Sequence, residues 1–270
     1  MSQSSVRWCF NLSKWSPTYP ELLLATSCIQ PEEKLRLGRF VFTKDFKSSL
    51  IGRLMMRKFA SESCEKNYET LTFIRDERGR PLLSLTESIN FNVSHQGDYT
   101  VLAGEVNSDV LLGIDVMKLE YTGGKALSEF FRIMDRNFSN IEWRQIYDST
   151  DQLKTFCRLW ALKESYTKAI GLGITVKLNE ISFQLASPLS VNKSVQDTKL
   201  FVSGRKMIEW HFNETLLDED HCVAVATNKK VADVRFRELN FGGLMQNAKP
   251  LLPPDEGYCL EYFKKPERPV

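Results

Sequence analysis

The stretch Trp-Ala-Leu-Lys-Glu-Ser-Tyr-Thr-Lys-Ala, residues 160–169, is the part around which we interpret this chain of 270 residues. Apolar residues recur here at helical spacing and no proline interrupts them, so the stretch predicts a helix that ends near Gly171 and Gly173. Glu164 and Lys168 are four residues apart and therefore share one face of that helix. An arbitrary pair of this kind is usually an exposed ion pair, so the rest of the chain decides its meaning.

A carboxylate in a second stretch of sequence suggests a functional role for the pair of Glu164 and Lys168. Residues 110–117, Val-Leu-Leu-Gly-Ile-Asp-Val-Met, are nearly all apolar, as expected of a strand buried on both faces. A buried Asp115 is costly unless it is paired, hydrogen-bonded or bound to a metal, so we predict that it is functional. Magnesium takes one or two protein carboxylates and completes its shell with waters and substrate phosphates. Asp115 and Glu164 together therefore make a plausible divalent-cation site.

Two helices are predicted before this strand. Residues 31–33, Pro-Glu-Glu, are typical of a helix start, with proline in the first turn and acids near the positive end of the dipole. A second helical pattern covers residues 45–60. Its basic residues, which we expect on a solvated face, are Lys47, Arg53, Arg57 and Lys58.

A charged turn and a hairpin follow these helices. Residues 75–81, Arg-Asp-Glu-Arg-Gly-Arg-Pro, place three arginines on one loop after a short strand, and guanidinium groups match phosphate bidentately. Residues 89–95 and 99–106 read as paired strands, with polar residues of the first strand facing outward. A hydrolase that uses Ser94 and His95 is disfavoured, because neighbouring strand residues point to opposite faces and no nucleophile elbow surrounds Ser94.

The order of elements indicates an α+β fold made of two similar halves. A helix followed by antiparallel strands occurs within residues 45–106 and again within residues 154–227, where strands are expected at 180–185, 199–202, 208–212 and 221–227. We therefore predict a pseudo-twofold arrangement with the active site in the cleft between the halves. The predicted domains are residues 1–108, residues 109–229 and an extended C-terminal tail, residues 230–270.

Composition restricts the classes of function. A net charge of +2 argues against a general nucleic-acid or membrane-surface binder. Six cysteines without metal-type spacing are typical of free thiols in a reducing compartment. Because the N-terminus lacks a signal or transit pattern and no run is long enough to span a membrane, we expect a cytosolic protein. We also expect a monomer.

Several motifs then occur together in one order. Gly113-Ile114-Asp115 is followed by Trp160, Lys163-Glu164 and Lys168. Further motifs that match the same family in order and spacing are residues 31–34, residues 91–95, Phe130-Phe131, and Ser139 with Glu142. This set resembles the 4′-phosphopantetheinyl transferases of the two-domain surfactin-synthetase-activating class, and is most similar to the animal members of that family. The resemblance covers most of the chain.

The resemblance implies a reaction and its central residues. Coenzyme A would donate 4′-phosphopantetheine to a serine hydroxyl of an acyl carrier protein, and 3′,5′-ADP would leave. Asp115 and Glu164 would bind Mg²⁺, and Glu164 would also be the general base, directly or through a water. Lys168 would meet the pyrophosphate.

The resemblance also implies groups that hold coenzyme A. The adenosine phosphates, notably the 3′-phosphate, would be held by Arg36, Arg75, Arg80, Asn92, Ser94 and His95. One departure concerns the metal: bacterial members often carry a third acid where this chain has Met117, whose thioether is a poor ligand for magnesium. The missing oxygen ligand is either Gln96 or an extra water.

The carrier partners are implied by resemblance alone. Animal members suggest the carrier domains of fatty acid synthase and of aminoadipate-semialdehyde dehydrogenase. The alternative function is a non-catalytic module that binds coenzyme A or a carrier protein. The presence of Asp115, Glu164 and Lys168 favours the enzyme, because a pure binding site has less need of all three.

Overall fold

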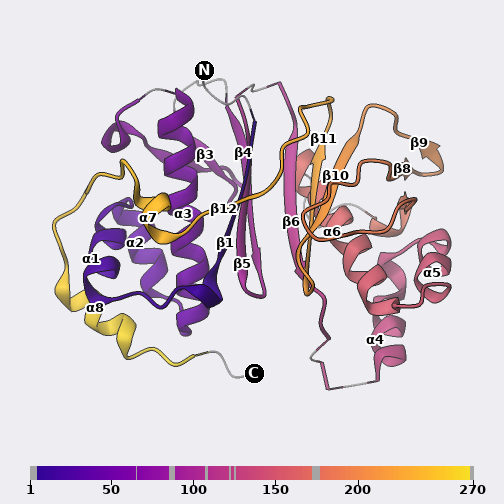
Figure 1. Cartoon of the computed structure of the whole chain (residues 1–270), viewed down its shortest axis with the longest axis horizontal. Helices are drawn as coiled ribbons and strands as arrows, with labels where there is room; N and C mark the ends of the chain where they lie inside the picture. The colour runs from indigo at the N-terminus through magenta and orange to yellow at the C-terminus, as the bar shows by residue number, and fades with distance from the viewer. Residues whose placement is uncertain are drawn as a thin grey trace. The chain divides into compact units, whose positions relative to one another are not determined.

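A computed structural model describes residues 5–64, 66–84, 89–106, 109–121, 123–124, 126–171 and 177–267 of the chain. The chain divides into two compact units, one made of Met1–Ser108 with Arg237–Val270 and the other of Asp109–Phe236. Each unit combines helices with a mainly antiparallel sheet, which confirms the predicted α+β class (Figure 1). The pseudo-twofold arrangement and the cleft between the halves stay predictions.

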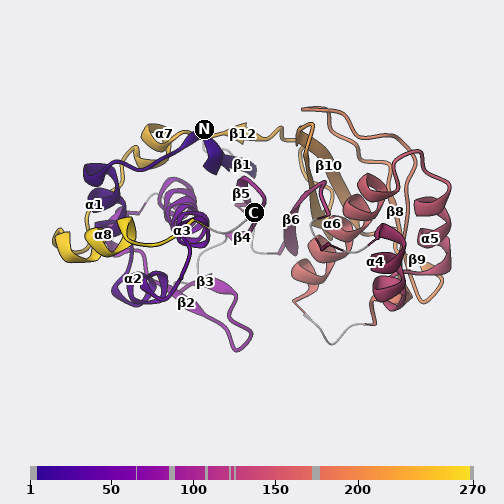
Figure 2. The same cartoon turned by 90° about the horizontal axis from the view of Figure 1, so that it is seen from below.

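The first unit is built on a four-stranded sheet in the order β12-β1-β5-β4. Its strands are β1 (Ser5–Asn11), β4 (Asn90–Gln96), β5 (Tyr99–Glu105) and β12 (Arg237–Glu238). The helices are α1 (Tyr19–Ser27), α2 (Pro31–Gly38), α3 (Thr43–Cys64), α7 (Phe241–Met245) and α8 (Glu256–Phe263), and a small hairpin pairs β2 (Phe73–Arg75) with β3 (Pro81–Leu83). The long helix α3 packs on β4 and β5, as Figure 2 shows from below.

The basic residues of α3 are a correction to the sequence prediction. Arg53, Arg57 and Lys58 are buried, with 4%, 0% and 6% of their surface exposed. Arg57 is tolerated there because its guanidinium donates to the backbone oxygens of Tyr68 and Leu71. The solvated face that we predicted is therefore occupied by protein, since α1, α2 and α7 also pack against α3.

The second unit has a three-stranded sheet in the order β10-β11-β6. Its strands are β6 (Leu112–Lys118), β10 (His211–Asp218) and β11 (His221–Thr227). A smaller sheet contains β7 (Ile181–Gln184), β8 (Lys199–Val202) and β9 (Arg205–Lys206), and the helices are α4 (Leu127–Met134), α5 (Asn140–Tyr147) and α6 (Gln152–Ile170). Helix α6 packs on β6 and β11.

Both units repeat one topology. In the first, β1 is followed by α3 and by the hairpin β4–β5, whose last strand pairs antiparallel with β1. In the second, β6 is followed by α6 and by the hairpin β10–β11, whose last strand pairs antiparallel with β6. The repeated unit thus includes a leading strand in addition to the helix and strands seen in the sequence.

Two predicted segments differ in the structure. The strand predicted at residues 208–212 is displaced to β10, and Ile208 is 77% exposed outside it. The C-terminal tail is not simply extended, because it forms β12, α7 and α8 and belongs to the first unit. Its apolar residues supply the reason: Leu239, Leu244 and Cys259 are buried in the core of that unit.

Other expectations concern thiols, membranes and the end of α6. All six cysteines are free thiols. Among the described residues, no helix is long and apolar enough to cross a membrane. Helix α6 ends at Gly171, whose φ of 67° suits glycine at a helix C-cap, while the second predicted stop, Gly173, lies outside the described residues.

Candidate functional site

A salt bridge joins β6 to α6 at the centre of the second unit. Lys168 Nζ lies 2.6 Å from Asp115 Oδ1 and also donates to the backbone oxygen of Ile114 at 3.3 Å. The side chain of Asp115 is 8% exposed and that of Lys168 is 29% exposed. Asp115 is therefore a buried carboxylate whose cationic partner is partly exposed to solvent. A buried charge needs such a partner because burying it alone is costly.

Gly113 allows this pairing because it brings the strand unusually close to the helix. A Cβ at position 113 would lie 2.0 Å from the backbone oxygen of Ser165 and 2.5 Å from the backbone nitrogen of Ala169. These are main-chain atoms that cannot rotate away, so any side chain here would push β6 and α6 apart. The glycine two residues before Asp115 thus sets the distance across which Asp115 meets Lys168.

Glu164 lies half-buried one helical turn before Lys168. Its pKa is raised above the ordinary value of 4.5, first by burial and then by the negative charge of Asp115, while Lys168 opposes the shift. A carboxylate whose pKa is raised is a stronger base than an ordinary one. Asp115 and Glu164 therefore repel each other electrostatically, and a cation between them would relieve that repulsion.

The two carboxylates fit a magnesium ion in ligand chemistry and in number. Oxygen ligands suit Mg²⁺, which usually takes few of them from protein. Within the described ranges there is no group of three or more His, Cys, Asp or Glu side chains placed to hold a metal. Any further ligands would have to come from amide, water or substrate oxygens.

Lys163 belongs to a different environment from its neighbour Glu164. Its ammonium group lies 2.8 Å from Glu142 Oε2, with both side chains 0% exposed, and it donates to the backbone oxygens of Leu178 and Ile181. Burial lowers the pKa of Lys163, and Glu142 opposes that shift. Lys163 therefore anchors α6 from its buried side, and its charge is not directed to Asp115.

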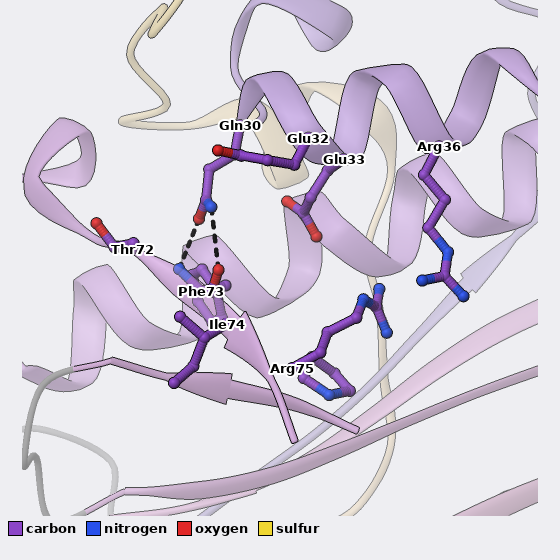
Figure 3. Close-up of a pocket in the computed structure, with 9 residues that line it drawn as sticks. Gln30, Glu32, Glu33, Arg36, Thr72, Phe73, Ile74 and Arg75 are labelled. Carbon is purple, nitrogen blue, oxygen red and sulfur yellow. Dashed lines mark hydrogen bonds between the residues drawn. The ribbon is translucent and has the colours of Figure 1, made fainter. Parts of the chain in front are cut away.

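A second cluster of candidate residues lines a pocket in the first unit. The pocket has a volume of about 400 Å³ and is lined by Gln30, Glu32, Glu33, Arg36, Thr72, Phe73, Ile74, Arg75 and Pro81. The guanidinium groups of Arg36, from α2, and Arg75, from β2, extend toward each other in Figure 3. Burial lowers the pKa of Arg75 most, and the positive charge of Arg36 lowers it further. The two guanidinium groups could bind an anion bidentately, although Glu32 and Glu33 line the same pocket and offset their charge.

The wall of this pocket contains a buried acid, Glu33, that pairs with Arg53 of α3. Glu33 Oε1 lies 3.4 Å from Arg53 Nε, and both side chains are at least nine-tenths buried. Burial raises the pKa of Glu33, although Arg53 and Arg75 oppose the rise. The side-chain amide of Gln30, in the same wall, accepts a hydrogen bond from the backbone nitrogen of Phe73 at 2.6 Å and donates one to its backbone oxygen at 3.0 Å (Figure 3). The pocket is therefore held together by α2, α3 and β2.

The remaining predicted residues lie on or beside β4. Arg80 donates to Asn90 Oδ1 at 2.9 Å and to the oxygen of Phe91, so it joins the small hairpin to that strand. The prediction that the polar residues of β4 face outward is wrong in part. Asn92 and Ser94 are buried, whereas His95 and Gln96 are exposed. Alternation itself holds, because the intervening Val93 faces Gly52 of α3.

Sequence reasoning placed the central residues on the right elements but missed several contacts. It expected Lys168 to meet the pyrophosphate but did not anticipate the ion pair of Lys168 with Asp115. It also gave no role to Gln30, Glu33 or Arg53. The one available signal was the helix start at residues 31–33, which placed an acid in the first turn without indicating that it is buried.

Comparisons with known proteins show which family the chain is similar to. The family described as 4′-phosphopantetheinyl transferase, N-terminal, matches residues 13–107, and the 4′-phosphopantetheinyl transferase superfamily matches residues 111–226. The human L-aminoadipate-semialdehyde dehydrogenase-phosphopantetheinyl transferase is 41% identical over 282 residues, covering 95% of this chain and 90% of the relative. Its Xenopus laevis counterpart is 39% identical, covering 98% and 94%. The Bacillus subtilis 4′-phosphopantetheinyl transferase Sfp is 28% identical, covering 64% and 73%.

Proposed function

Because the chain belongs to the 4′-phosphopantetheinyl transferase family, we propose that it transfers 4′-phosphopantetheine from coenzyme A to a serine hydroxyl of acyl carrier proteins. The observation that carries this proposal is the cluster of Asp115, Lys168 and Glu164 on β6 and α6. It combines a proton acceptor of raised pKa with a lysine, which are the groups that phosphoryl transfer needs from a protein.

The proposed step forms one phosphorus–oxygen bond and breaks another. The carrier serine oxygen attacks the β-phosphorus of coenzyme A, and the bond from that phosphorus to the bridging oxygen breaks, releasing 3′,5′-ADP. Glu164 takes the serine proton, directly or through a water, and the burial that raises its pKa strengthens it as a base. Lys168 stabilises charge that develops on the pyrophosphate.

Asp115 and Glu164 are the residues that would hold Mg²⁺. When bound, the ion would neutralise negative charge on the pyrophosphate. Lys168 already forms an ion pair with the Asp115 carboxylate, so a bound cation and Lys168 would both interact with that side chain. Asp115 therefore orients Lys168 in addition to its role toward the metal.

Gln96 is the candidate for a third oxygen ligand, with water as the alternative. Gln96 is exposed at the end of β4, in the register position opposite Tyr99, and a side-chain amide oxygen is an acceptable magnesium ligand. If Gln96 ligates, Gln96→Ala raises the Mg²⁺ concentration needed for half-maximal rate. An unchanged Mg²⁺ dependence would assign that position to water.

The 3′-phosphate of coenzyme A is assigned to the pocket of the first unit. Arg36 and Arg75 supply two guanidinium groups there. The rest of the adenosine phosphates are assigned to Asn92, Ser94 and His95 on the edge strand β4, and to Arg80, which donates to Asn90 of that strand. Support for this assignment is the pair of guanidinium groups in a pocket with a volume of about 400 Å³.

The carriers are proposed from the relatives' names and from the enzyme class. The relatives at about 40% identity are named for L-aminoadipate-semialdehyde dehydrogenase, so its carrier domain is one proposed substrate. The carrier domain of fatty acid synthase is the other, which would make the protein a holo-[acyl-carrier-protein] synthase as well. We place this reaction in the cytosol and assign it to a monomer.

The proposal is tested by loading a carrier. The chain is incubated with coenzyme A, Mg²⁺ and an apo acyl carrier protein, and the mass of the carrier is measured. We expect the carrier to gain the mass of phosphopantetheine. If the carrier stays unmodified under conditions in which an established transferase loads it, while coenzyme A still binds, the protein is a binding module and the catalytic proposal is wrong.

A further inference from the structure

The C-terminal segment contacts one face of helix α2 in the first unit. Asp255 caps helix α8 by accepting from the nitrogen of Tyr258 at 3.0 Å, and its other oxygen lies 2.8 Å from Lys34 Nζ. The hydroxyl of Tyr258 donates to the backbone oxygen of Lys34 at 2.7 Å. The middle of α2 is thus tied to the first turn of α8 by an ion pair and a hydrogen bond.

A second contact holds the C-terminal end of α2. Lys265 Nζ donates to the backbone oxygens of Gly38 at 3.1 Å and Phe40 at 2.6 Å. These carbonyls lie where α2 ends, so a cation there satisfies acceptors and complements the negative end of the helix. The ring of Tyr258 fills the space beside Gly38, since a Cβ at that glycine would lie 3.4 Å from it.

Helix α2 needs such support because it is short and carries pocket residues. It has eight residues, and isolated helices of about 12 residues or fewer are marginal in water. It presents Arg36 to the pocket opposite Arg75, and the two positive charges repel each other. Its other anchors are the buried Leu37 and the pair of Glu33 with Arg53. A looser α2 would let Arg36 move away from Arg75.

We propose that the C-terminal segment, residues 255–265, is a positioning element of the coenzyme A site, because it fixes α2 so that Arg36 stands beside Arg75. Asp255, Tyr258 and Lys265 act through α2 and do not touch the ligand. The inference rests on the proposed function, since the ligand of the pocket is taken to be the 3′-phosphate of coenzyme A.

The test compares two neighbouring lysines in the whole protein. Lys265→Met removes the donor to the end of α2, whereas Lys264→Met removes the same charge from a surface pair with Glu261 on α8 itself. Titration calorimetry with coenzyme A and with 3′,5′-ADP gives Kd, and steady-state kinetics gives KM and kcat. We expect Lys265→Met to raise Kd and KM about 3- to 10-fold with little change in kcat.

Two further variants separate positioning from general loss of stability. Lys265→Arg keeps a donor for the carbonyls and should restore Kd, and Tyr258→Phe, which lacks only a hydroxyl, should raise Kd even if Lys265→Met folds poorly. Equal Kd values for Lys265→Met, Tyr258→Phe, Lys264→Met and wild type would overturn the inference. If wild type itself bound neither coenzyme A nor 3′,5′-ADP, the proposed function would fail together with it.

Discussion

Lys163 Nζ and Glu142 Oε2 lie 2.8 Å apart, and neither side chain is exposed to solvent. Glu142 also completes the capping box of α5 with Ser139 and accepts from the nitrogen of Phe183. Removing one member of such a pair leaves the other charge buried without its partner. We predict that Lys163→Met and Glu142→Gln each lower the free energy of unfolding by about 3–5 kcal/mol, measured by urea denaturation.

The exposed pair of Lys177 with Glu180 is the matched control. Their nitrogen and oxygen atoms lie 3.3 Å apart, but the side chains are 79% and 47% exposed. Lys177→Met should therefore leave the urea midpoint unchanged within error. A loss from Lys163→Met no larger than that from the control would show that the buried pair does not hold α6 in place.

Arg36 and Arg75 should discriminate between coenzyme A and dephospho-coenzyme A, which lacks the 3′-phosphate. Loss of a charge-assisted contact weakens binding by about 1.5–3 kcal/mol, so Arg36→Gln and Arg75→Gln should raise KM for coenzyme A about 10- to 100-fold. KM for dephospho-coenzyme A should change little. Arg39→Gln, at the exposed C-cap of α2, is the control. Equal effects on both substrates would place the 3′-phosphate elsewhere.

Asp115 should control the protonation of Glu164. Burial and the charge of Asp115 raise the Glu164 pKa, and Lys168 lowers it, so Asp115→Asn removes one of the two raising causes while burial and Lys168 continue to act. The Glu164 pKa should therefore fall, as measured by carbon-13 NMR titration of its carboxyl group. Asp109→Asn, which alters an exposed pair with Lys229, should leave it unchanged. A Glu164 pKa that stays the same in Asp115→Asn would mean that the two carboxylates do not interact.

The pH dependence of transfer follows from the same shift. Glu164 accepts a proton only when ionised, so kcat should rise with pH as Glu164 loses its proton. In the metal-free protein, burial and Asp115 raise the pKa of Glu164 above its ordinary value, which NMR titration without Mg²⁺ should show. Because the folded state raises this pKa, the contribution of Glu164 to stability is present at low pH and lost as pH rises through the folded-state pKa. Activity and stability therefore respond to Glu164 in opposite directions.

The elements of the fold were predictable where one periodicity dominated. The apolar run around Asp115 and the helical pattern around Glu164 correctly located β6 and α6. The contact between them was not predictable as a distance, because Asp115 and Lys168 are 53 residues apart and Gly113 sets their separation. The repeat of a helix followed by strands could be recognised in the sequence. The leading strand of each repeat could not, because only the strand pairing in the structure shows that it pairs with the last strand of the hairpin.

Charged and proline-rich segments misled the sequence analysis. Arg57 on α3 looked solvated, yet it is fully buried because backbone carbonyls and the ring of Tyr68 surround its guanidinium. Prolines at 250, 253 and 254 are typical of an extended segment, although Asp255 directly after them is the N-cap of α8. In both cases a tertiary partner, which no local pattern encodes, determined the outcome.

The most direct test of the central claim is Glu164→Gln. Carrier loading is measured by mass spectrometry in a single turnover, and coenzyme A binding is measured by calorimetry on the same preparation. We predict that loading falls at least about 1,000-fold while Kd for coenzyme A changes little, because the base is lost and the arginines remain. The variant should be no less stable than wild type at neutral pH, since it removes a half-buried carboxyl whose ionisation burial disfavours. Near-normal loading by Glu164→Gln would contradict the assignment of the active site to Asp115, Glu164 and Lys168.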